Sequence, residues 1–482
     1  MLGKQIRLLV AWVTLLCGHM HGFTEKTYLA FQPLRSNFEQ RYGAWQEFIE
    51  RERRDECGGR IELEMFYKAS TNKAQLGRYF GVNDKNNIAI GKRFVGPDLN
   101  AVDPLSCADV DLRYFIHNFL LDNRKVQLRI TPEQTMFGLQ MFYFQSLDAM
   151  CKNVFLQIDL PVLFIENNLN ALFTPSGYLP NQNPNEVMEY FQGTVEDEHQ
   201  DQLLSAARIN GKKKTSGLSD MTCKVGYYLL NKLDKHVSIS LVSTIPLGNK
   251  PKGAFLFEPI RGSGGHFGLG FDVAGDMLLW DNFDTNVQII SRVGYRYLFE
   301  TDQRRTLGIK GRRFGQYYLL GQNGQKQLIP AANVLTKPLS VSGLSQLEGV
   351  VGLNVNSYSW NIGCSYSLLA IEPEEVTLKG CWPEQTYGVA SFGFEGFAGA
   401  FGTRPSNFDS GRMNDWIRSQ DLDRQAAETP GHTTHRLQLA GSKFFDCSNQ
   451  TFLVTMGLGY EFSNRNNNWA GWDTSAGVGI SF

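Results

Sequence analysis

The feature that most constrains this chain is an alternation of apolar and polar residues that continues for ten or more residues at a time. In the stretch 452–462 every second residue is apolar, namely Phe452, Val454, Met456, Leu458, Tyr460 and Phe462. Successive side chains of a β-strand point to opposite faces, so a period of two predicts a strand with one apolar and one polar face. Globular strands usually stop at about 5 to 6 residues, whereas a tilted strand that crosses a bilayer needs about 9 to 11. The length of these stretches therefore favours membrane-spanning strands.

The alternation recurs along most of the chain after residue 60. It is clearest at 347–355, 358–368, 452–462 and 472–482, and similar stretches lie at 60–67, 126–143, 154–160, 221–229, 237–245, 269–273, 287–299, 387–394 and 437–445. We expect roughly 12 to 16 strands, and because single-chain bacterial barrels have even strand numbers, about 14 is the best estimate. The predicted fold is all-β, a transmembrane antiparallel β-barrel.

A soluble two-sheet sandwich would also show period two, since each of its strands has a core face and a solvent face. Three features favour the barrel: an export signal, the strand lengths, and a polar face rich in Gly, Ser and Asn. In hydrocarbon every backbone polar group must pair within the sheet, and a closed barrel achieves this. Aromatic residues such as Tyr295, Tyr297, Phe299, Tyr460 and Trp472 are expected to form interfacial girdles.

The chain divides into three predicted parts. Lys4 and Arg7 precede an apolar run at 8–16, which is typical of a secretory signal peptide over residues 1–22. Residues 23–56 are expected to form a helical periplasmic segment, because Ser36 and Glu39 have capping-box spacing. Residues 57–482 form the barrel, with long extracellular loops. Among the long insertions, 166–217 is the candidate for a plug.

Charge and cysteine content exclude several functions. Lys plus Arg total 47 against 48 for Asp plus Glu, so no electrostatic feature favours a nucleic-acid partner. Seven of the eight cysteines follow the signal peptide, and an odd number cannot all pair within the chain. Their spacing does not fit a zinc site, while one or two loop disulfides remain open.

Charged residues on polar strand faces are candidates for the lining of a pore. An arginine on the lipid face would cost about 2 to 4 kcal/mol near the bilayer midplane, so we assign these side chains to the interior. They would set ion selectivity through the local field, or they would form interior salt bridges without tuning transport. The candidates are Arg129, Lys224, Asp272, Arg292 and Arg296.

Histidines give little support for catalysis or metal binding. His266 would suit a barrel lipase, but Gly268 occupies the position where a serine nucleophile is needed. His432 and His435 lie in a Thr-rich stretch with no adjacent acidic ligand. We therefore expect no enzyme activity, no metal and no cofactor.

The last residues, 475–482, end in Phe482 with apolar residues at alternate positions, and resemble the C-terminal signal that Gram-negative barrel-assembly machinery recognises. The resemblance implies that Trp472, Val478, Ile480 and Phe482 carry this signal. Stretches at 294–300, 305–308 and 392–400 also resemble poorly characterised porin-like proteins of host-associated bacteria. This likeness implies the bacterial outer membrane as location, and outer-membrane lipid and the assembly machinery as partners.

Together these patterns predict a porin-like channel for passive diffusion of small hydrophilic solutes. Assembly into a homo-oligomer is compatible with this function. The alternative is a surface adhesin or receptor that is anchored by its barrel and acts through its long loops.

Overall fold

The computed structural model describes residues 26, 58–81, 85–91, 109–111, 125–176, 185–195, 200, 202–232, 234–282, 284–323, 328–357, 359–389, 416–447, 450–463 and 469–482. The predicted signal peptide and, apart from Lys26, the predicted helical segment at 23–56 lie outside these residues. Within them, no helix has the length and apolar character required to cross a bilayer.

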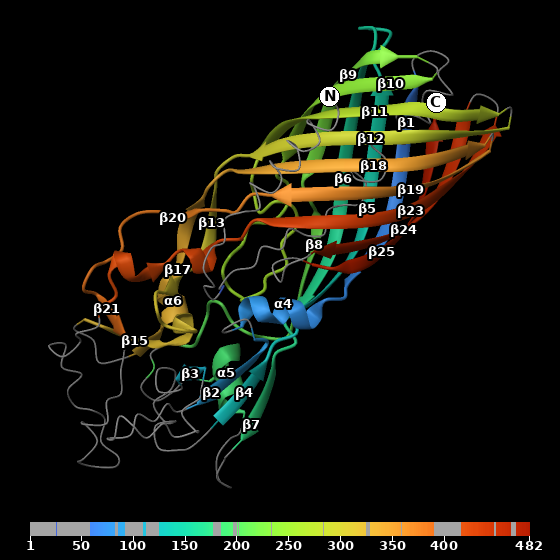
Figure 1. Cartoon of the computed structure of the whole chain (residues 1–482). Helices are drawn as coiled ribbons and strands as arrows, with labels where there is room; N and C mark the ends of the chain where they lie inside the picture. Colours follow the sequence, from blue (N-terminus) through green and yellow to red (C-terminus); the bar gives the residue numbers. More distant parts are fainter. Residues whose placement is uncertain are drawn as a thin grey trace, which may run out of the picture.

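Twelve antiparallel strands form a closed barrel (Figure 1). No strand of the ring has a free edge: β5 pairs with β6, and the first strand, β1, pairs with the last, β25. The strands have 11 to 16 residues each, the length expected for tilted membrane strands. They are β1 (Gly59–Ser70), β5 (Glu133–Ser146), β6 (Val154–Asn168), β9 (Met221–Asn231), β10 (Lys235–Ile245), β11 (Gly268–Asn282), β12 (Thr285–Leu298), β18 (Leu344–Ser357), β19 (Trp360–Ile371), β23 (His432–Cys447), β24 (Gln450–Ser463) and β25 (Gly471–Ser481).

The count of twelve replaces the estimate of 14 within the predicted range. A thirteenth strand, β8 (Lys212–Leu218), pairs with residues 162–168 of β6, whereas β9 pairs with residues 154–159. β8 and β9 therefore share one edge of β6 and occupy one position in the ring. Residues 126–129 and 387–389, which also alternate, belong to small sheets outside the barrel.

The two ends of the barrel differ. At one end the hairpins turn tightly, and Gly59 N donates to Phe482 O at 2.7 Å, so the start of β1 and the end of β25 meet there. At the other end the long connections fold into a layer that we call the cap (Figure 1). Bacterial barrels have short periplasmic turns and long extracellular loops, so we expect the cap to face the cell exterior.

In the residues that the structure describes, the cap contains four small sheets and short helices around its own apolar core. Tyr190 and Tyr317 are buried in this core, and each donates a hydrogen bond of 2.7 Å to a backbone carbonyl, of Tyr317 and Ala207 respectively. The principal cap elements are α4 (Lys73–Phe80), β2 (Asn87–Gly91), β3 (Val110–Asp111), β4 (Lys125–Arg129), β7 (Leu172–Ser176), α5 (Glu186–Gln192), β13 (Thr301–Thr306), β14 (Gly308–Ile309), β15 (Leu319–Gln322), β16 (Leu328–Pro330), α6 (Ala331–Leu335), β17 (Thr336–Val341), β20 (Val376–Leu378), β21 (Tyr387–Val389) and β22 (Leu422–Asp423).

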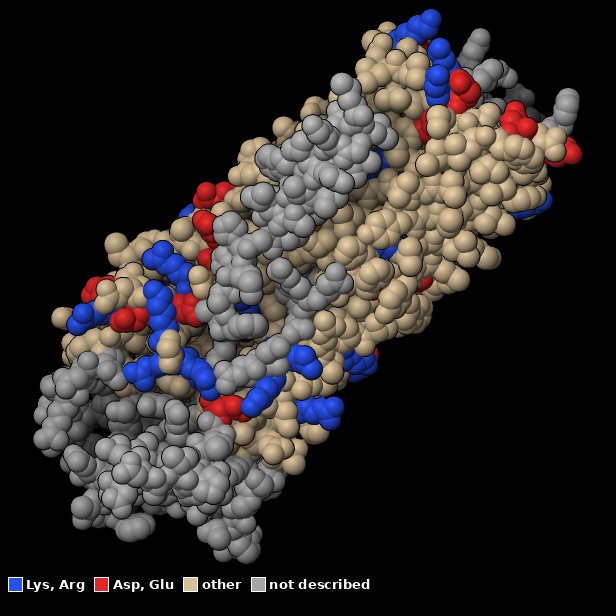
Figure 2. Space-filling view, in the orientation of Figure 1, with Lys and Arg blue, Asp and Glu red and all other residues tan. Residues whose placement is uncertain are grey.

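The predicted alternation places apolar side chains outside the barrel and polar ones inside. On β1, Met65 and Tyr67 are 53% and 38% exposed, whereas Glu64 and Lys68 are at most 1% exposed. Figure 2 shows the same result at the surface, where the barrel is mostly tan and charged side chains gather toward its ends. A continuous apolar outer surface of this size is stable only against lipid. The sandwich alternative is excluded, because stacked sheets would bury these side chains.

Aromatic rings mark both boundaries of the apolar surface. At the cap side, ring pairs lie with centroids 5.5 Å apart for Tyr67 and Trp472, and 5.8 Å for Phe267 and Phe299. Tyr460 stacks on Phe462 in the same band. At the short-turn side the exposed rings are Trp280, Trp360, Phe445, Phe452 and Phe482. Paired aromatic bands are typical of transmembrane barrels, as the sequence predicted.

Candidate functional site: the barrel interior

The inner wall of the barrel is mostly polar, with an apolar cluster that includes Phe142, Phe144 and Phe155. Its charged side chains are nearly inaccessible to water, with exposed fractions of at most 9% except at Arg296, which is half-buried. The inward charged residues are Arg60, Glu62, Glu64, Lys68, Asp159, Lys224, Asp272, Asp276, Arg292, Arg296, Glu348, Arg436, Glu461 and Asp473. Burial of so many ionised groups is favourable only if they pair with one another.

One charge network takes residues from four strands and spans five neighbouring ones, from β9 to β18. Asp272 on β11 accepts hydrogen bonds from Arg292 on β12 at 2.7 Å and interacts with the Lys224 ammonium on β9 at 2.8 Å. To do so, Lys224 reaches across β10, where Ser240 is the register partner of Asp272. The Arg292 guanidinium also lies 4.0 Å from Glu348 on β18. These four alternating charges form a band on one side of the interior.

A second network lies on the strands that close the ring. Lys68 on β1 pairs with Glu461 on β24, and Arg436 on β23 donates to Asp473 on β25 at 2.7 Å. Lys68 and Asp473 are register partners. The burial of the Lys68 ammonium is therefore matched by carboxylates from two adjacent strands.

Glycines on neighbouring strands provide the space for these side chains. Gly294 is the register partner of Asp272, and Gly459 is the partner of Asp473. A Cβ atom at either glycine would lie closer than 3.0 Å to the carboxylate of its partner. The glycine-rich polar face seen in the sequence therefore has a packing role.

Aromatic side chains lie among the charges near the short-turn end of the interior. The ring of Phe155 contacts Phe144 and Tyr228, with centroids 5.6 and 4.8 Å apart. Next to them, His236 Nδ1 lies 2.7 Å from Asp276 Oδ2, and both side chains are buried. Charged residues share this depth, since Arg60 and Glu62 on β1 are the register partners of Phe144 and Phe142 on β5.

The structure brings four of the five predicted lining residues to the interior. Lys224, Asp272 and Arg292 belong to the first network, and Arg296 Nη1 lies 3.5 Å from Thr244 Oγ1 toward the cap. Arg129 is the exception, and the prediction that it lines the barrel is wrong. It lies exposed on β4, in the cap sheet with β2 and β7. Its period-two neighbours reflect a buried cap face rather than a barrel wall.

Sequence reasoning did not select the second network. Glu461 and Asp473 stand on the polar side of the clearest alternating stretches, and Lys68 and Arg436 have the same parity on their strands. A parity rule applied to every charged residue would therefore have found them. The contact between Lys68 and Glu461 depends on ring closure, which joins residues 393 positions apart.

The residues of the predicted assembly signal lie on the last strand. Trp472 and Val478 are exposed on the outer face of β25, at 42% and 58%, and Phe482 follows the strand at 52%. Ile480 is on the same face and is half-buried. This face is accessible from the membrane, but recognition by assembly machinery stays a prediction.

The histidines and cysteines hold no metal or disulfide site in the described residues. The His435 ring stacks on Phe462 and its Nδ1 lies 2.7 Å from the Tyr366 hydroxyl, on the outer surface. His266 instead binds the Phe299 carbonyl through Nδ1, and the Ser263 hydroxyl donates to Asp220. Ser263 is therefore not arranged as a nucleophile with His266 as its base. The described cysteines, Cys151, Cys223, Cys364, Cys381 and Cys447, are all free.

No protein-family model and no curated protein matches the chain. Among solved structures, it is similar to an outer membrane channel from Pseudomonas putida F1, with 8% identity over 89% of this chain and 97% of the other, and a TM-score of 0.37. The β domain of the Bordetella autotransporter BrkA gives 10% identity, 89% and 100% coverage, and a TM-score of 0.33. The NanC porin gives 7% identity, 71% and 92% coverage, and a TM-score of 0.27.

Strand pairing, the apolar exterior and the aromatic bands of the chain itself define the class of protein. It is a bacterial outer-membrane β-barrel.

Proposed function

We propose that the barrel is a channel for passive diffusion of small hydrophilic solutes. The observation that carries this proposal is the charged interior, in which cations and acids from nearby strands offer hydrogen-bonding partners on the wall. A barrel that served only as an anchor could fill its interior with neutral side chains and avoid the cost of desolvating charges.

The balance of interior charge supports a modest preference for cations. Among the inward charged side chains that the structure describes, Arg60, Lys68, Lys224, Arg292, Arg296 and Arg436 are opposed by a larger set of acids. The acids are Glu62, Glu64, Asp159, Asp272, Asp276, Glu348, Glu461 and Asp473. Rings of like charge at a constriction set ion selectivity, so the surplus of carboxylates favours cations.

The packing of the interior supports a narrow channel. Eight-stranded barrels are filled by side chains and those with about 16 to 18 strands leave an open aqueous channel, so twelve strands lie between these limits. The low exposure of the wall charges means that ions pass only when side chains move aside. We therefore expect small, intermittent conductance steps.

Single-channel recording in planar bilayers tests the proposal. Purified protein under a KCl gradient should give discrete steps with a reversal potential of the sign that cation preference requires. The Glu348→Gln variant should move that potential toward the anion side, because it removes a wall carboxylate. Asp302→Asn is the matched control, since Asp302 lies in the cap with its side chain 55% exposed. Complete silence over many insertions, with protein shown to be folded, would reject the channel.

The cap favours a second candidate, a surface receptor or adhesin anchored by the barrel. Its apolar core and small sheets give the long connections a defined shape that a partner could recognise. Deleting α5 would not test this, because Tyr190 and Phe191 are buried in the core and their loss would unfold the cap. A silent barrel whose folded wild-type cap binds a partner would favour the receptor.

A further inference from the structure

One part of the cap-side rim combines exposed apolar residues with exposed lysines. The apolar outer surface of β5, β6 and β8 ends at Phe137, Phe164 and Leu218, which are 43%, 49% and 42% exposed. The Phe137 and Phe164 rings are in contact, with centroids 6.0 Å apart. These three residues mark the edge of the lipid-facing surface on this side of the barrel.

Lysines follow directly beyond this edge. Glu166 comes two residues after Phe164 on the same face of β6, about 6.6 Å along the strand. Lys212 and Lys214 on β8 flank Glu166, with N–O distances of 2.9 and 3.0 Å, and their side chains remain 63% and 74% exposed. Glu133 at the start of β5 pairs with Lys73 of α4 at 2.8 Å. Two ammonium groups share one carboxylate at Glu166, so a positive charge is left over at the surface.

More cations lie behind this row. Lys213 and Arg208 both stack on the ring of Phe255, at 4.1 and 4.5 Å from its centroid. Arg261 donates to the Leu218 carbonyl at 2.9 Å, next to Gly217. Figure 2 shows basic side chains gathered where the barrel meets the cap. On this segment of the rim, the described cations outnumber the acids Glu133, Glu166 and Asp220.

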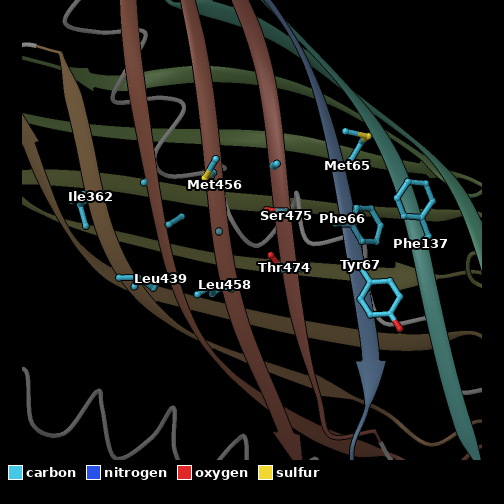
Figure 3. A pocket seen from close by; sticks show the side chains of 14 residues that line it. Met65, Phe66, Tyr67, Phe137, Ile362, Leu439, Met456, Leu458, Thr474 and Ser475 are labelled. Carbon is cyan, nitrogen blue, oxygen red and sulfur yellow. The ribbon is translucent and has the colours of Figure 1, made fainter.

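An apolar groove begins beside the same edge. It has a volume of about 660 Å³ and is lined by outward side chains that include Met65, Tyr67, Phe137 and Met456. Figure 3 shows Tyr67 and Phe137 next to each other on β1 and β5, where they are register partners. Phe137 thus belongs both to the groove and to the edge below the lysines. Small outward residues, Thr474 and Ala476, form part of the groove lining.

We propose that this segment of the rim binds a phosphorylated membrane lipid, with its phosphate at Lys212 and Lys214 and an acyl chain along Phe137 in the groove. The occupant is an amphiphile because the cationic and apolar parts adjoin on one continuous face. Lysines next to a membrane surface attract anionic headgroups by about 1 kcal/mol each. Because the long connections of the cap place it outside the cell, the lipid is a phosphorylated glycolipid of the outer leaflet.

Binding of bisphosphorylated lipid A to the full-length protein in detergent tests the proposal, with native mass spectrometry as the readout. The Lys212→Gln/Lys214→Gln variant should bind about 10- to 30-fold more weakly, which corresponds to two headgroup contacts. Glu166→Gln should bind more tightly, because it frees both lysines. Ala476→Phe should weaken binding by filling the groove. The matched control is Lys232→Gln/Lys235→Gln, an equal charge change at the short-turn end.

Several outcomes would overturn the proposal. Equal binding of lipid A without phosphates would show that only the apolar groove binds the lipid. Full competition by inorganic phosphate would indicate a free-phosphate site. Equal losses in the control variant would indicate a general charge effect. Heat-modifiable migration on gels verifies folding, and if the double variant does not fold, Lys214→Gln alone should still show a several-fold loss.

Discussion

Asp272 on β11 lies directly across from Gly294 on β12, and its carboxylate occupies the space that a side chain at position 294 would need. This arrangement lets the carboxylate meet Arg292 and Lys224 together, at 2.7 and 2.8 Å. The same relation joins Asp473 to Gly459 on the other network. In both networks, an inward aspartate therefore lies opposite a glycine that leaves space for its carboxylate.

Replacing Gly294 should disturb the first network without changing any charge. In Gly294→Ala the new Cβ would lie closer than 3.0 Å to Asp272 Oδ1, so the carboxylate must move away from its cations. We expect a loss of about 1 to 3 kcal/mol in the free energy of unfolding, measured by urea titration in detergent micelles. Gly349→Ala on the adjacent strand is the control, because a Cβ there meets no atom within 4 Å. Equal effects of the two substitutions would contradict the pairing.

Asp272→Asn should destabilise the barrel and change its ion preference. The substitution leaves Lys224 and Arg292 buried with less negative charge, and breaking a buried pair costs about 3 to 5 kcal/mol. Reversal potentials should shift toward anions. Adding Lys224→Met to Asp272→Asn should recover part of the stability, because one buried cation is removed. Asp234→Asn, at an exposed turn, should change neither quantity.

Arg305 should hold the cap together. It is fully buried, and its guanidinium donates to Glu374 Oε2 at 2.6 Å, to Gln303 Oε1 at 2.9 Å and to the Ala427 carbonyl at 2.8 Å. Arg305→Met leaves the Glu374 carboxylate buried without its counter-ion, so the cap should become sensitive to protease while the barrel stays resistant. Adding Glu374→Gln should restore part of the resistance. The exposed neighbour Arg304 provides the control substitution, Arg304→Met.

Acid should loosen the cap around His266. Its Nδ1–H donates to the Phe299 carbonyl at 2.7 Å, and its Nε2 accepts from the Gln303 amide at 3.3 Å. The Gln303 amide cannot reverse this role, because its oxygen accepts from Arg305. Protonation of Nε2 would therefore place two donors against each other. Burial lowers the pKa of His266 below its usual 6.5.

A lowered histidine pKa in the folded state means that the unfolded state binds the proton more readily. The stability contributed by neutral His266 is present above about pH 6.5 and is lost as the pH falls below it. Hydrogen exchange at 263–268 and 301–306 should rise between pH 7.5 and 5.5, and His266→Gln should abolish the change. Burial opposes ionisation of Glu374, but Arg305 outweighs it and lowers the pKa of this carboxyl, so a second loss should begin only below pH 4.5.

Single-cysteine variants should report the orientation of the barrel. Cys381 is exposed in the cap, Cys151 is exposed in a short turn, and Cys364 faces lipid on β19. With a membrane-impermeant maleimide, we expect Cys381 to react on intact cells and Cys151 only after the membrane is permeabilised. Cys364 should stay protected in both conditions. Reaction of Cys151 on intact cells would show that the barrel has the opposite orientation, with its short turns outside.

Much of the barrel wall could be predicted from the sequence because each strand meets lipid on one face and the polar interior on the other. That contrast is local, so the parity of Lys224, Asp272 and Arg292 indicates their inward direction without knowledge of their partners. The exposed and buried positions of β24 repeat the alternation of residues 452–462 for the same reason.

The alternation of apolar and polar residues could not decide which sheet a strand joins. Arg129 alternates with buried Leu128 and Ile130, yet β4 pairs with β2 and β7 in the cap, because a buried cap core imposes the same period as a lipid boundary. Likewise, only tertiary structure placed Lys68 beside Glu461 and Asp272 opposite Gly294. Those contacts depend on strand register and on closure of the ring, which are set by backbone hydrogen bonds between distant segments rather than by any one segment's own pattern.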